Sequence, residues 1–434
     1  MNDFTGLGLR APLLRALEEE GYATPTPIQG KAIPIVLAGR DLIGIAQTGT
    51  GKTAAFALPI LERLAADPQP LQPRTTRALI LAPTRELAIQ IGESFGVYSR
   101  HLKLRHETAF GGVPIGRQIN RLKGGIDVLI ATPGRLLDLM RQRAVSLQRV
   151  TQFVLDEADR MLDMGFINDV RKIAAELPKI HQTALFSATM PTEVRKLADS
   201  LLHQPERVEV TPPATTVERI NQSVVFVDKA RKRLALAQLL QDAAVSRVLV
   251  FTRTKHGANK VALQLEQDGI EADAIHGNKS QNARQRALEG FRNGKLRVLV
   301  ATDIASRGID VDGVTHVVNY ELPHEPESYV HRIGRTARAG ATGIAISLVD
   351  GEERGLLRDI ERATRQTIAV ATMNLPKGAP PPAPRPQQQQ QPSRQPRSAN
   401  ENQPRDRGER SERPAGQQPR RRWKPRNNRR TATA

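Results

Sequence analysis

The sequence reads Ala46-Gln-Thr-Gly-Thr-Gly-Lys-Thr53 between an apolar run, Leu42 to Ile45, and a helical pattern. This order of strand, glycine-rich loop and helix is typical of a phosphate-binding loop, in which backbone N–H groups at the helix N-terminus surround phosphate oxygens. Ala46 stands where the generic motif has its first glycine. We expect Lys52 to reach the β- and γ-phosphates and Thr53 to place its hydroxyl on Mg²⁺. The stretch predicts an α/β domain that binds a nucleotide.

Other apolar runs of strand length also end in small or polar residues, and helix-length amphipathic segments such as Arg117 to Leu122 and Lys232 to Asp242 lie among them. This alternation predicts βαβ units and a parallel sheet in each half of the chain. A polar residue commonly does no more than end a strand, but six such cases together favour a binding site, because ligands bind at the carboxyl ends of parallel strands. The runs begin at Arg77, Asp127, Phe153, Ala184, Arg247 and Arg297.

The chain is expected to divide into two domains and a tail. We place the first domain at residues 1–205 and a linker at 206–218, where two adjacent prolines and small polar residues interrupt the periodic pattern. The second domain follows at 219–370 and the tail at 371–434. From Pro380 onward the chain contains no Val, Ile, Leu, Met, Phe or Tyr but eleven prolines, so it cannot bury enough apolar surface to fold. The sequence predicts a disordered Arg/Pro/Gln-rich tail.

The net charge of the 434 residues is +19, and this charge is unevenly distributed along the chain. Residues 380–434 carry fourteen Arg and Lys against four Asp and Glu, which is over half of the net charge. Such an excess predicts a polyanionic partner, most often nucleic acid. We expect the tail to bind RNA without sequence preference through its arginines and Trp423, the only Trp, which could stack on a base. A solubilising or protein-docking tail is the alternative.

Several classes of protein are excluded or disfavoured by composition. The chain has no cysteine, which excludes disulfides, thiol catalysis and cysteine zinc sites. No apolar stretch is long enough to span a membrane, and the first residues, Met1 to Gly6, lack the basic and apolar regions of a secretory signal. We therefore expect a cytoplasmic protein with no membrane partner, and a monomer.

A second nucleotide element follows the apolar run that begins at Phe153. Asp156 would hold Mg²⁺ directly or through water, and Glu157 would orient the water that attacks the γ-phosphate. An Asp-Glu pair after a strand is by itself commonly a helix N-cap. The phosphate loop upstream favours the catalytic interpretation here.

The run Asp156-Glu-Ala-Asp159 gives the chain a family resemblance: it resembles a DEAD-box RNA helicase of superfamily two over roughly residues 4 to 370. Gly21 to Gln29 is similar to the Q motif, which implies that Gln29 hydrogen-bonds the adenine edge and that Tyr22 stacks on the base. The resemblance implies two tandem RecA-like, doubly wound parallel-sheet domains with a disordered basic C-terminal tail, and ATP and Mg²⁺ as cofactors. The implied ATP-binding residues are Tyr22, Gln29, Ala46, Gln47, Thr48, Gly49, Thr50, Gly51, Lys52, Thr53 and Asp310.

In the second half, Arg335 and Arg338 are three residues apart, so on a helical turn they share one face and point at one anion. The resemblance assigns them as arginine fingers that reach the γ-phosphate. Ala337 departs from the glycine that is usual in this motif, and we expect activity to survive the change. Ser187, Thr189 and His331 would couple hydrolysis to unwinding. The implied catalytic residues are Lys52, Asp156, Glu157, Arg335 and Arg338, with Thr53 and Asp156 as metal ligands.

Further motifs resemble the RNA-contacting motifs of the family. Small residues let the backbone approach phosphates closely, and Thr and Arg side chains donate to them, so these motifs would grip a strand without reading bases. Within the family, His276 to Gln281, Asp156 to Phe166 and Phe251 to Ala258 resemble the bacterial RhlE type. The implied RNA-binding residues are Pro83, Thr84, Arg85, Gly111, Gly112, Thr132, Pro133, Gly134 and Arg135 in the first half and Arg253, Gln281, Arg284 and Thr302 in the second.

The sequence thus predicts an RNA-dependent ATPase that locally unwinds short RNA duplexes or remodels RNA–protein complexes. Two alternatives stay open: an ATP-dependent RNA clamp or annealing chaperone, and a helicase-like DNA translocase. Complete catalytic residues disfavour an inactive enzyme, and the Q motif disfavours a DNA motor. The RNA substrate is not identified, because ribosome assembly, RNA decay and cold adaptation all suit such a protein, with ribosomal precursors or RNA-decay proteins as partners of the tail.

Overall fold

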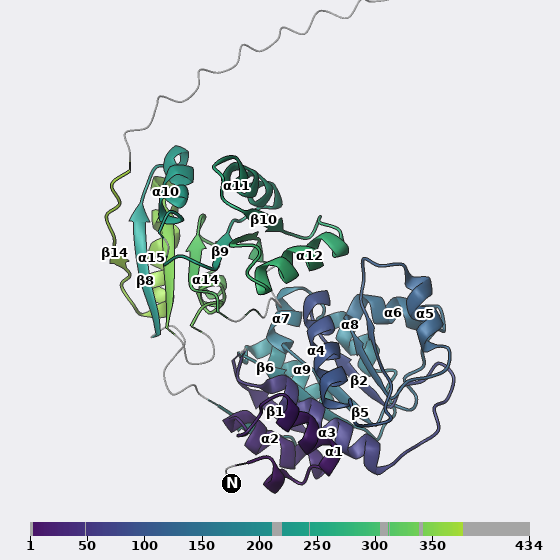
Figure 1. The fold of residues 1–434 in the computed structure, drawn as a ribbon. Coiled ribbons are helices and arrows are strands. Elements are labelled where there is room, and N and C mark those ends of the chain that lie inside the picture. Colours follow the sequence, from purple (N-terminus) through teal and green to yellow (C-terminus); the bar gives the residue numbers. More distant parts are fainter. Residues whose placement is uncertain are drawn as a thin grey trace, which may run out of the picture. The chain divides into compact units, whose positions relative to one another are not determined.

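The computed structural model describes residues 3–47, 49–210, 219–242, 244–303, 311, 313–337 and 342–375. Three predicted site residues, Thr48, Asp310 and Arg338, lie outside the described residues, as do residues 211–218 of the expected linker and the tail from residue 376. Residues Met1–Gly378 form one compact unit that holds two sheets (Figure 1). We call residues 3–210 the first lobe and residues 219–375 the second lobe.

The first lobe is built on a seven-stranded sheet in the order β3-β4-β2-β5-β6-β1-β7, and every pair of neighbours is parallel. Most of its strands are buried on both faces, which explains their continuous apolar runs. The strands are β1 (Leu42–Ile45), β2 (Ala78–Leu81), β3 (His106–Ala109), β4 (Val128–Ala131), β5 (Gln152–Leu155), β6 (Gln182–Ser187) and β7 (Glu206–Glu209).

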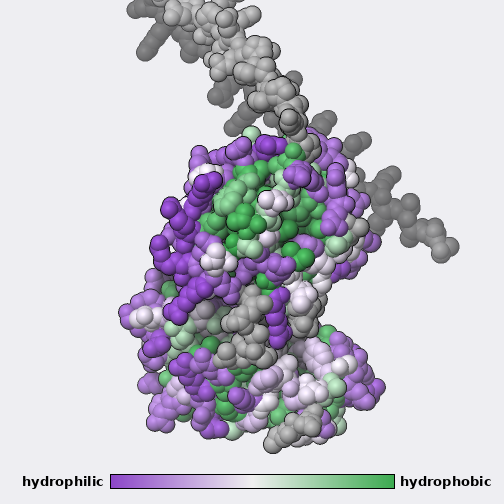
Figure 2. Space-filling model, turned by 90° about the vertical axis from the view of Figure 1, so that its left-hand side faces the viewer, coloured by the Kyte–Doolittle hydropathy of each residue, from purple (hydrophilic) through white to green (hydrophobic). Residues whose placement is uncertain are grey.

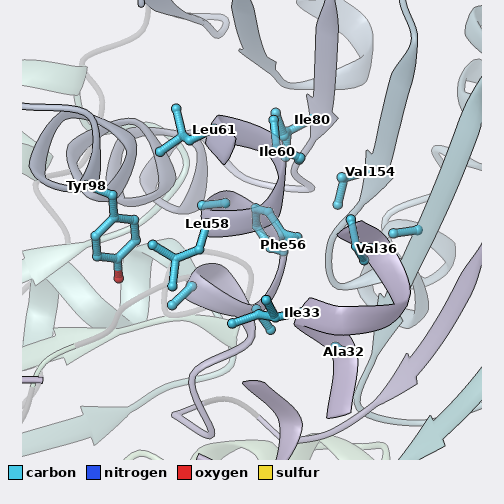
Figure 3. Close-up of a cluster of buried hydrophobic side chains, with 14 of the residues drawn as sticks. Ala32, Ile33, Val36, Phe56, Leu58, Ile60, Leu61, Ile80, Tyr98 and Val154 are labelled. Atoms are coloured by element: carbon cyan, nitrogen blue, oxygen red, sulfur yellow. The ribbon is translucent and has the colours of Figure 1, made fainter. Parts of the chain in front are cut away.

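Helices cover both faces of this sheet and enclose two apolar cores. On one face α1 to α4 pack against Ile80 and Val154, and Phe56 of α3 lies in the middle of that core (Figure 3). On the other face α6 to α9 pack against the alternate strand residues, among them Leu79 and Leu129. The helices are α1 (Ala11–Glu19), α2 (Pro27–Leu37), α3 (Lys52–Ala66), α4 (Arg85–Tyr98), α5 (Ile115–Leu122), α6 (Pro133–Arg141), α7 (Ala158–Asp163), α8 (Ile167–Ala174) and α9 (Thr192–Leu201), after a short 3₁₀ turn, η1 (Thr5–Leu7).

The second lobe repeats this plan with a parallel sheet in the order β10-β11-β9-β12-β13-β8-β14. Helices α10 and α11 cover one face, and α12, α14 and α15 contribute to the cores on the other. The strands are β8 (Ile220–Phe226), β9 (Val248–Phe251), β10 (Ala272–Ile275), β11 (Val298–Ala301), β12 (His316–Asn319), β13 (Gly343–Val349) and β14 (Ala369–Val370). The helices are η3 (Lys229–Arg231), α10 (Lys232–Leu239), α11 (Lys255–Gln267), α12 (Gln281–Arg292), α14 (Pro326–Ile333), η4 (Gly351–Glu353) and α15 (Arg354–Thr364). Two doubly wound parallel-sheet domains are therefore confirmed.

The beginning of the expected linker is part of the first sheet. Glu206 to Glu209 form β7, which pairs with β1 at the edge of the sheet, so only the residues after 210 could serve as a linker. The strand was not recognised in the sequence because it is short and amphipathic: Val208 is buried whereas Arg207 and Glu209 are exposed. An edge strand needs only one apolar side chain to attach to the core.

The surface of the second lobe is partly apolar. Figure 2 views the molecule from the side on which β8, β14 and α10 lie in Figure 1, and its upper part shows hydrophobic residues surrounded by hydrophilic ones. Phe226 of β8 and Val370 of β14 are 43% and 62% exposed, and the Arg354 guanidinium lies 5.1 Å from the centre of the Phe226 ring. Among the described helices, none has the length and apolar character that a membrane span requires.

Candidate functional site

The phosphate loop has a shape that depends on glycine. Gly51 has φ of 90°, and a Cβ atom there would lie 2.3 Å from the side-chain nitrogen of Gln29, so any other residue would be strained and would displace Gln29. Gly49 also has a left-handed φ, of 84°. Ala46 is buried and is not among the described residues with positive φ, which explains why alanine is accepted where the generic motif has glycine. Lys52 begins α3, is 6% exposed, and its Nζ donates to the Ala46 carbonyl at 2.9 Å.

The Q-motif residues connect α2 to the phosphate loop. The Gln29 amide oxygen accepts from Thr26 N at 2.9 Å, which caps α2, and its nitrogen donates to the Gly51 carbonyl at 3.2 Å. The amide that the sequence assigned to adenine therefore also supports the loop that would hold the phosphates. Tyr22 is 43% exposed, and its ring centre lies 6.2 Å from that of Tyr98 in α4.

One cavity of about 860 Å³ joins most of the predicted nucleotide residues. This volume lies within the range of known ligand pockets. The sequence reasoning missed several residues of its wall: Gln90, Ser94 and Tyr98 from α4 and Arg292 from α12. No motif marks them, because they reach the cavity only through the packing of these helices. The predicted residues that line it are Tyr22, Gln29, Gly49, Gly51, Lys52, Thr53, Asp156, Glu157 and Arg335, the last from the second lobe.

Asp156 is a buried carboxylate that suits a cation. It follows β5, is 2% exposed, and accepts from Glu157 N at 3.0 Å. Burial raises the pKa of Asp156 to about 7, although the nearby Lys52 ammonium opposes this shift. Carboxylate and hydroxyl oxygens, here from Asp156 and Thr53, are ligands that Mg²⁺ accepts. In the described part of the chain no group of three or more His, Cys, Asp or Glu could hold a metal, so a magnesium ion here would depend on phosphate oxygens as well.

Glu157 occupies an unusual backbone position and is kept ionised. Its φ is 54°, in the left-handed region, and its carboxylate lies 2.5 Å from the Arg160 guanidinium, with both side chains almost fully buried. Burial acts to raise the pKa of Glu157, but Arg160, followed by Lys52 and Arg335, outweighs it, and the pKa is lowered. An ionised carboxylate is the form that accepts a hydrogen bond from water. Arg335 itself is buried, and its Nε donates to the His331 carbonyl at 3.3 Å.

Asp159 links the carboxylates to the predicted coupling residues. Its Oδ2 accepts from Thr189 N at 2.8 Å, from Thr189 Oγ1 at 2.9 Å and from Ala188 N at 3.1 Å, while Asp159 N donates to Ser187 Oγ at 3.1 Å. Asp159 completes the motif Asp156-Glu-Ala-Asp159, but no role for it was predicted from the sequence. Burial lowers the pKa of His331, and Arg160 and Arg335 act in the same direction, so this side chain is neutral near pH 7.

The predicted RNA residues of the first lobe follow the carboxyl ends of β2, β3 and β4. Thr84 caps α4 by accepting from Leu87 N at 3.2 Å. The Arg85 guanidinium lies against Gly112, whose φ is 81° and where a Cβ atom would approach Arg85 Nη1 to 2.1 Å. Arg135 donates to Gln118 at 2.8 Å. The residues at this edge are Pro83, Thr84, Arg85, Gly111, Gly112, Thr132, Pro133, Gly134 and Arg135.

The predicted RNA residues of the second lobe also follow strands or begin α12. Arg284 Nη2 lies 2.9 Å from Glu86 Oε1 of the first lobe, and Gln281 Nε2 lies 3.4 Å from the same oxygen. Arg253 N donates to Glu321 at 2.8 Å, and Thr302 follows β11. Three buried polar atoms of these motifs have no hydrogen-bond partner among the described residues: Arg135 Nε, Gln281 Oε1 and Arg284 Nε. Unpaired buried polar atoms are rare, and these three lie in motifs predicted to contact RNA, while others, such as Gln152 Oε1 and Thr183 Oγ1, lie outside those motifs.

Comparison with known protein families agrees with the sequence motifs. Residues 26–197 match the family described as DEAD/DEAH box helicase, and residues 231–340 match the helicase conserved C-terminal domain. The DEAD-box ATP-dependent RNA helicase CshA of Bacillus cereus is 44% identical over 366 residues, which are 84% of this chain and 69% of the relative. CshA of Bacillus subtilis is 43% identical over 363 residues, which are 84% and 72%. The ATP-dependent RNA helicase DeaD of Buchnera aphidicola is 44% identical over 375 residues, which are 86% and 61%.

Solved structures show the same fold. The chain resembles S. cerevisiae Dbp5 bound to RNA and ADP BeF3 with a TM-score of 0.76 at 34% identity, covering 86% of this chain and 96% of the other. It resembles Mss116p bound to ssRNA and AMP-PNP with a TM-score of 0.74 at 29% identity, covering 85% of this chain and 78% of the other. The likeness extends over both lobes, because it covers more of the chain than either lobe contains.

Proposed function

The chain belongs to the DEAD-box family of ATP-dependent RNA helicases, and on that premise we propose that it couples RNA-stimulated ATP hydrolysis to local unwinding of short RNA duplexes or to remodelling of RNA–protein complexes. One observation supports this proposal above the others. The cavity of about 860 Å³ brings Lys52, Asp156 and Glu157 of the first lobe together with Arg335 of the second. Hydrolysis would then depend on both lobes, and so would RNA binding.

In the proposed mechanism the nucleotide is held from three sides. Gln29 and Tyr22 bind the adenine, the loop from Ala46 to Thr53 surrounds the phosphates, and Lys52 contacts the β- and γ-phosphates. Magnesium, held by Thr53 and Asp156, would neutralise phosphate charge. Glu157 accepts a hydrogen bond from the attacking water and so orients it towards the γ-phosphate.

Arg335 supplies positive charge where negative charge develops in the transition state, and we propose Arg338 and Asp310 as further contacts to phosphate and ribose from the sequence motif alone. Because Arg335 lies in the second lobe, the charge that speeds hydrolysis is in place only when this lobe meets the bound nucleotide. Asp159, Ser187, Thr189 and His331 would transmit this state between the two lobes.

RNA is proposed to bind by its backbone across both lobes. Arg135, Gln281 and Arg284 each have a buried polar atom with no partner among the described residues. Phosphate or ribose oxygens would accept from the two arginine Nε groups, and a ribose hydroxyl would donate to Gln281 Oε1. The glycines at 111 and 112 would let a strand approach beside the Arg85 guanidinium that lies against them. Arg85, Arg253 and Thr302 would extend this grip. A strand held by its backbone in a bent form is unable to remain in a duplex, which explains local strand separation without a preferred sequence.

We also propose a subtype, a compartment, an oligomeric state and a class of RNA for this protein. We infer the bacterial RhlE type from His276 to Gln281 and Phe251 to Ala258, although the relatives compared above carry the names CshA and DeaD. We also propose a cytoplasmic monomer. Its RNA would be a ribosomal precursor or a decay substrate, and the tail would bind either RNA or protein.

The decisive experiment is an ATPase titration with single-stranded RNA and with DNA of matched sequence. We expect RNA to raise kcat and DNA to leave it near the basal value, with Lys52→Ala as the inactive control. A short fluorescent RNA duplex in the same assay separates the alternatives: ATP-dependent binding without strand separation would favour the clamp or annealing chaperone. Equal stimulation by DNA would contradict the proposed substrate class.

A further inference from the structure

A second cavity of the first lobe, of about 620 Å³, is formed by residues that no motif includes. Its walls come from Pro73 and Arg74 before β2, from residues 137–148 in the second half of α6 and the segment after it, and from Lys172 in α8 and Glu176 just after that helix. Arg74 comes before β2, residues 144–148 come before β5 and Glu176 comes before β6, whereas the nucleotide and RNA residues follow the carboxyl ends of strands in the same sheet. All strands of this sheet are parallel, so the cavity lies at their amino-terminal ends, on the side of the sheet opposite to the nucleotide and RNA residues. We call it the basal cavity.

The basal cavity combines an apolar floor with a basic rim. Leu137, Val145 and Leu147 are buried beneath it, and Met140 is half-buried beside them. The rim is made of exposed side chains, four of them cationic and one of them a carboxylate. These rim residues are Arg74, Arg141, Arg143, Lys172 and Glu176.

Two of the four rim cations have no carboxylate partner among the residues that the structure describes. Arg141 pairs with Asp138 at 3.4 Å and Lys172 with Asp169 at 3.7 Å. No ion pair joins Arg74 or Arg143 to a carboxylate anywhere in the described ranges. Arg74 instead donates from Nη1 to the Arg143 carbonyl at 3.3 Å, so that the two guanidinium-bearing segments are tied to each other.

The backbone at both arginines is held in a costly conformation. Arg74 has φ of 58° and Arg143 has φ of 53°, in the left-handed region that L-residues avoid. Hydrogen bonds fix this geometry: Ser146 N donates to the Arg74 carbonyl at 2.7 Å, and Arg143 N donates to the Met140 carbonyl at 2.9 Å. Glu157, in the nucleotide site, is another of the few non-glycine residues in this region. This backbone strain is a third feature of the basal cavity, beside its shape and its charge. By itself it does not identify a ligand.

We propose that the basal cavity binds an acidic peptide segment of a protein partner, which inserts an aliphatic side chain against Leu137, Val145 and Leu147 and places carboxylates beside Arg74 and Arg143. Charge complementarity favours a carboxylate-bearing segment, because the rim has an excess of cations. RNA is the less suitable occupant, since no aromatic side chain lines the cavity on which a base could stack. The partner would dock without blocking the nucleotide or RNA residues.

The test uses the full chain and a short fluorescent peptide in which leucines alternate with Asp and Glu. We expect the charge-reversed double variant Arg74→Glu with Arg143→Glu to weaken peptide binding at least about tenfold, as measured by fluorescence anisotropy. The matched control, Arg358→Glu with Arg362→Glu on exposed positions of α15, makes the same change in net charge and should leave the affinity within about twofold. Equal losses in both variants would overturn the proposal, because binding would then follow overall charge.

Further measurements test the apolar contact, the location of the site and the class of ligand. A peptide with Ser in place of every leucine should bind about tenfold more weakly, and equal binding would refute the apolar part of the site. Hydrogen exchange should show that the peptide protects residues 137–148, and protection elsewhere would also refute the site. A fluorescent oligouridine should bind the double variant and the parent chain alike, whereas a selective loss of this RNA would replace the peptide by RNA. RNA-stimulated ATPase in the same samples tests the proposed function separately, since no rim residue belongs to its machinery.

Discussion

At the scale of single residues, Gly51 and Gln29 show why one substitution can affect two functions. The Gln29 side chain caps α2 and also contacts the Gly51 carbonyl, and the space between the two residues has no room for a methyl group. The proposed base recognition and the proposed phosphate loop therefore share one amide. A change at either residue is expected to alter both.

We predict that Gly51→Ala weakens ATP binding at least about tenfold. The new Cβ atom would lie 2.3 Å from Gln29 Nε2 on a backbone with φ of 90°, so the loop has to move. Calorimetric titration with a non-hydrolysable ATP analogue measures the effect. Gly355→Ala in α15, where a Cβ atom meets nothing within 4 Å, is the matched control and should keep the parent affinity.

Glu157→Gln is predicted to keep ATP and RNA affinity within about threefold while lowering kcat by at least about 100-fold. The amide preserves the shape of the carboxylate but is a much weaker acceptor for the attacking water. Its effect on turnover is read from RNA-stimulated phosphate release, and affinity from equilibrium binding. Normal hydrolysis by this variant would remove Glu157 from the mechanism.

At the scale of helices and strands, the sequence predicted those elements whose apolar residues form a continuous run or a helical period. Buried strands such as β2, β4 and β9 read as continuous apolar runs, and the polar residues that follow parallel strands lie at one end of their sheet; the roles assigned to these residues stay a prediction. Strand β7 escaped prediction because its single buried side chain, Val208, gives no pattern. Tyr98 escaped for another reason: it reaches the nucleotide cavity through the packing of α4. Asp159 belongs to the motif that was recognised in the sequence. Its contacts with Ser187 and Thr189 could not be predicted, because they form only when β5 and β6 lie side by side.

Helix α2 offers a test of element stability. Gly30 lies inside this helix with negative φ, and a Cβ atom there would meet nothing within 4 Å. Gly30→Ala should therefore stabilise the first lobe by about 0.5–1 kcal/mol, because alanine loses less backbone entropy in a helix. Scanning calorimetry should show a rise in midpoint of about 1–4 °C. Gly44→Ala in β1 is the opposite control, since its Cβ atom would lie 2.6 Å from the Phe186 ring and should lower the midpoint.

Strand β12 gives the second lobe a dependence on pH. Burial lowers the pKa of His316 below its ordinary value of 6.5, so the folded lobe holds this ring neutral whereas the unfolded chain protonates it. The free energy of unfolding should thus be fully retained above pH 6.5 and should fall below it, by at most about 1.4 kcal/mol per pH unit for one proton. Urea unfolding of His316→Gln between pH 7 and pH 5 should show a smaller fall than the parent. His203→Gln, at an exposed position, should follow the parent curve.

At the scale of the whole molecule, we assign ATP hydrolysis to the two lobes and part of the RNA affinity to the tail. The net charge of +19 suggests a generally basic protein, yet more than half of it belongs to residues 380–434. The two lobes instead hold a few buried charges at strand ends, and Glu86 of the first lobe contacts Arg284 of the second. Hydrolysis is predicted to depend on the lobes and RNA affinity to depend partly on the tail.

Deletion of residues 380–434 should weaken RNA binding while leaving kcat for ATP within about twofold. Each lost phosphate contact should flatten the slope of log affinity against log salt by about 0.7 for single-stranded RNA. Anisotropy titrations over a range of salt concentrations measure both quantities. An unchanged affinity at low salt would assign the tail to solubility or to protein docking.

The order of strands in the second sheet also determines when the second lobe can complete its folding during translation. Strand β8 is the first of this lobe to leave the ribosome, but its neighbours are β13 and β14, the last strands in the described part of the chain. About 120 residues separate β8 from β13, which corresponds to roughly 6–25 s of translation at about 5–20 residues per second. During that time Val224 and Val225 lack their final partners, whereas the first lobe already has all its strands. Strand β1 of the first lobe waits in the same way for β6 and β7, so each lobe passes through a stage of synthesis in which its first strand is unpaired and exposed to aggregation.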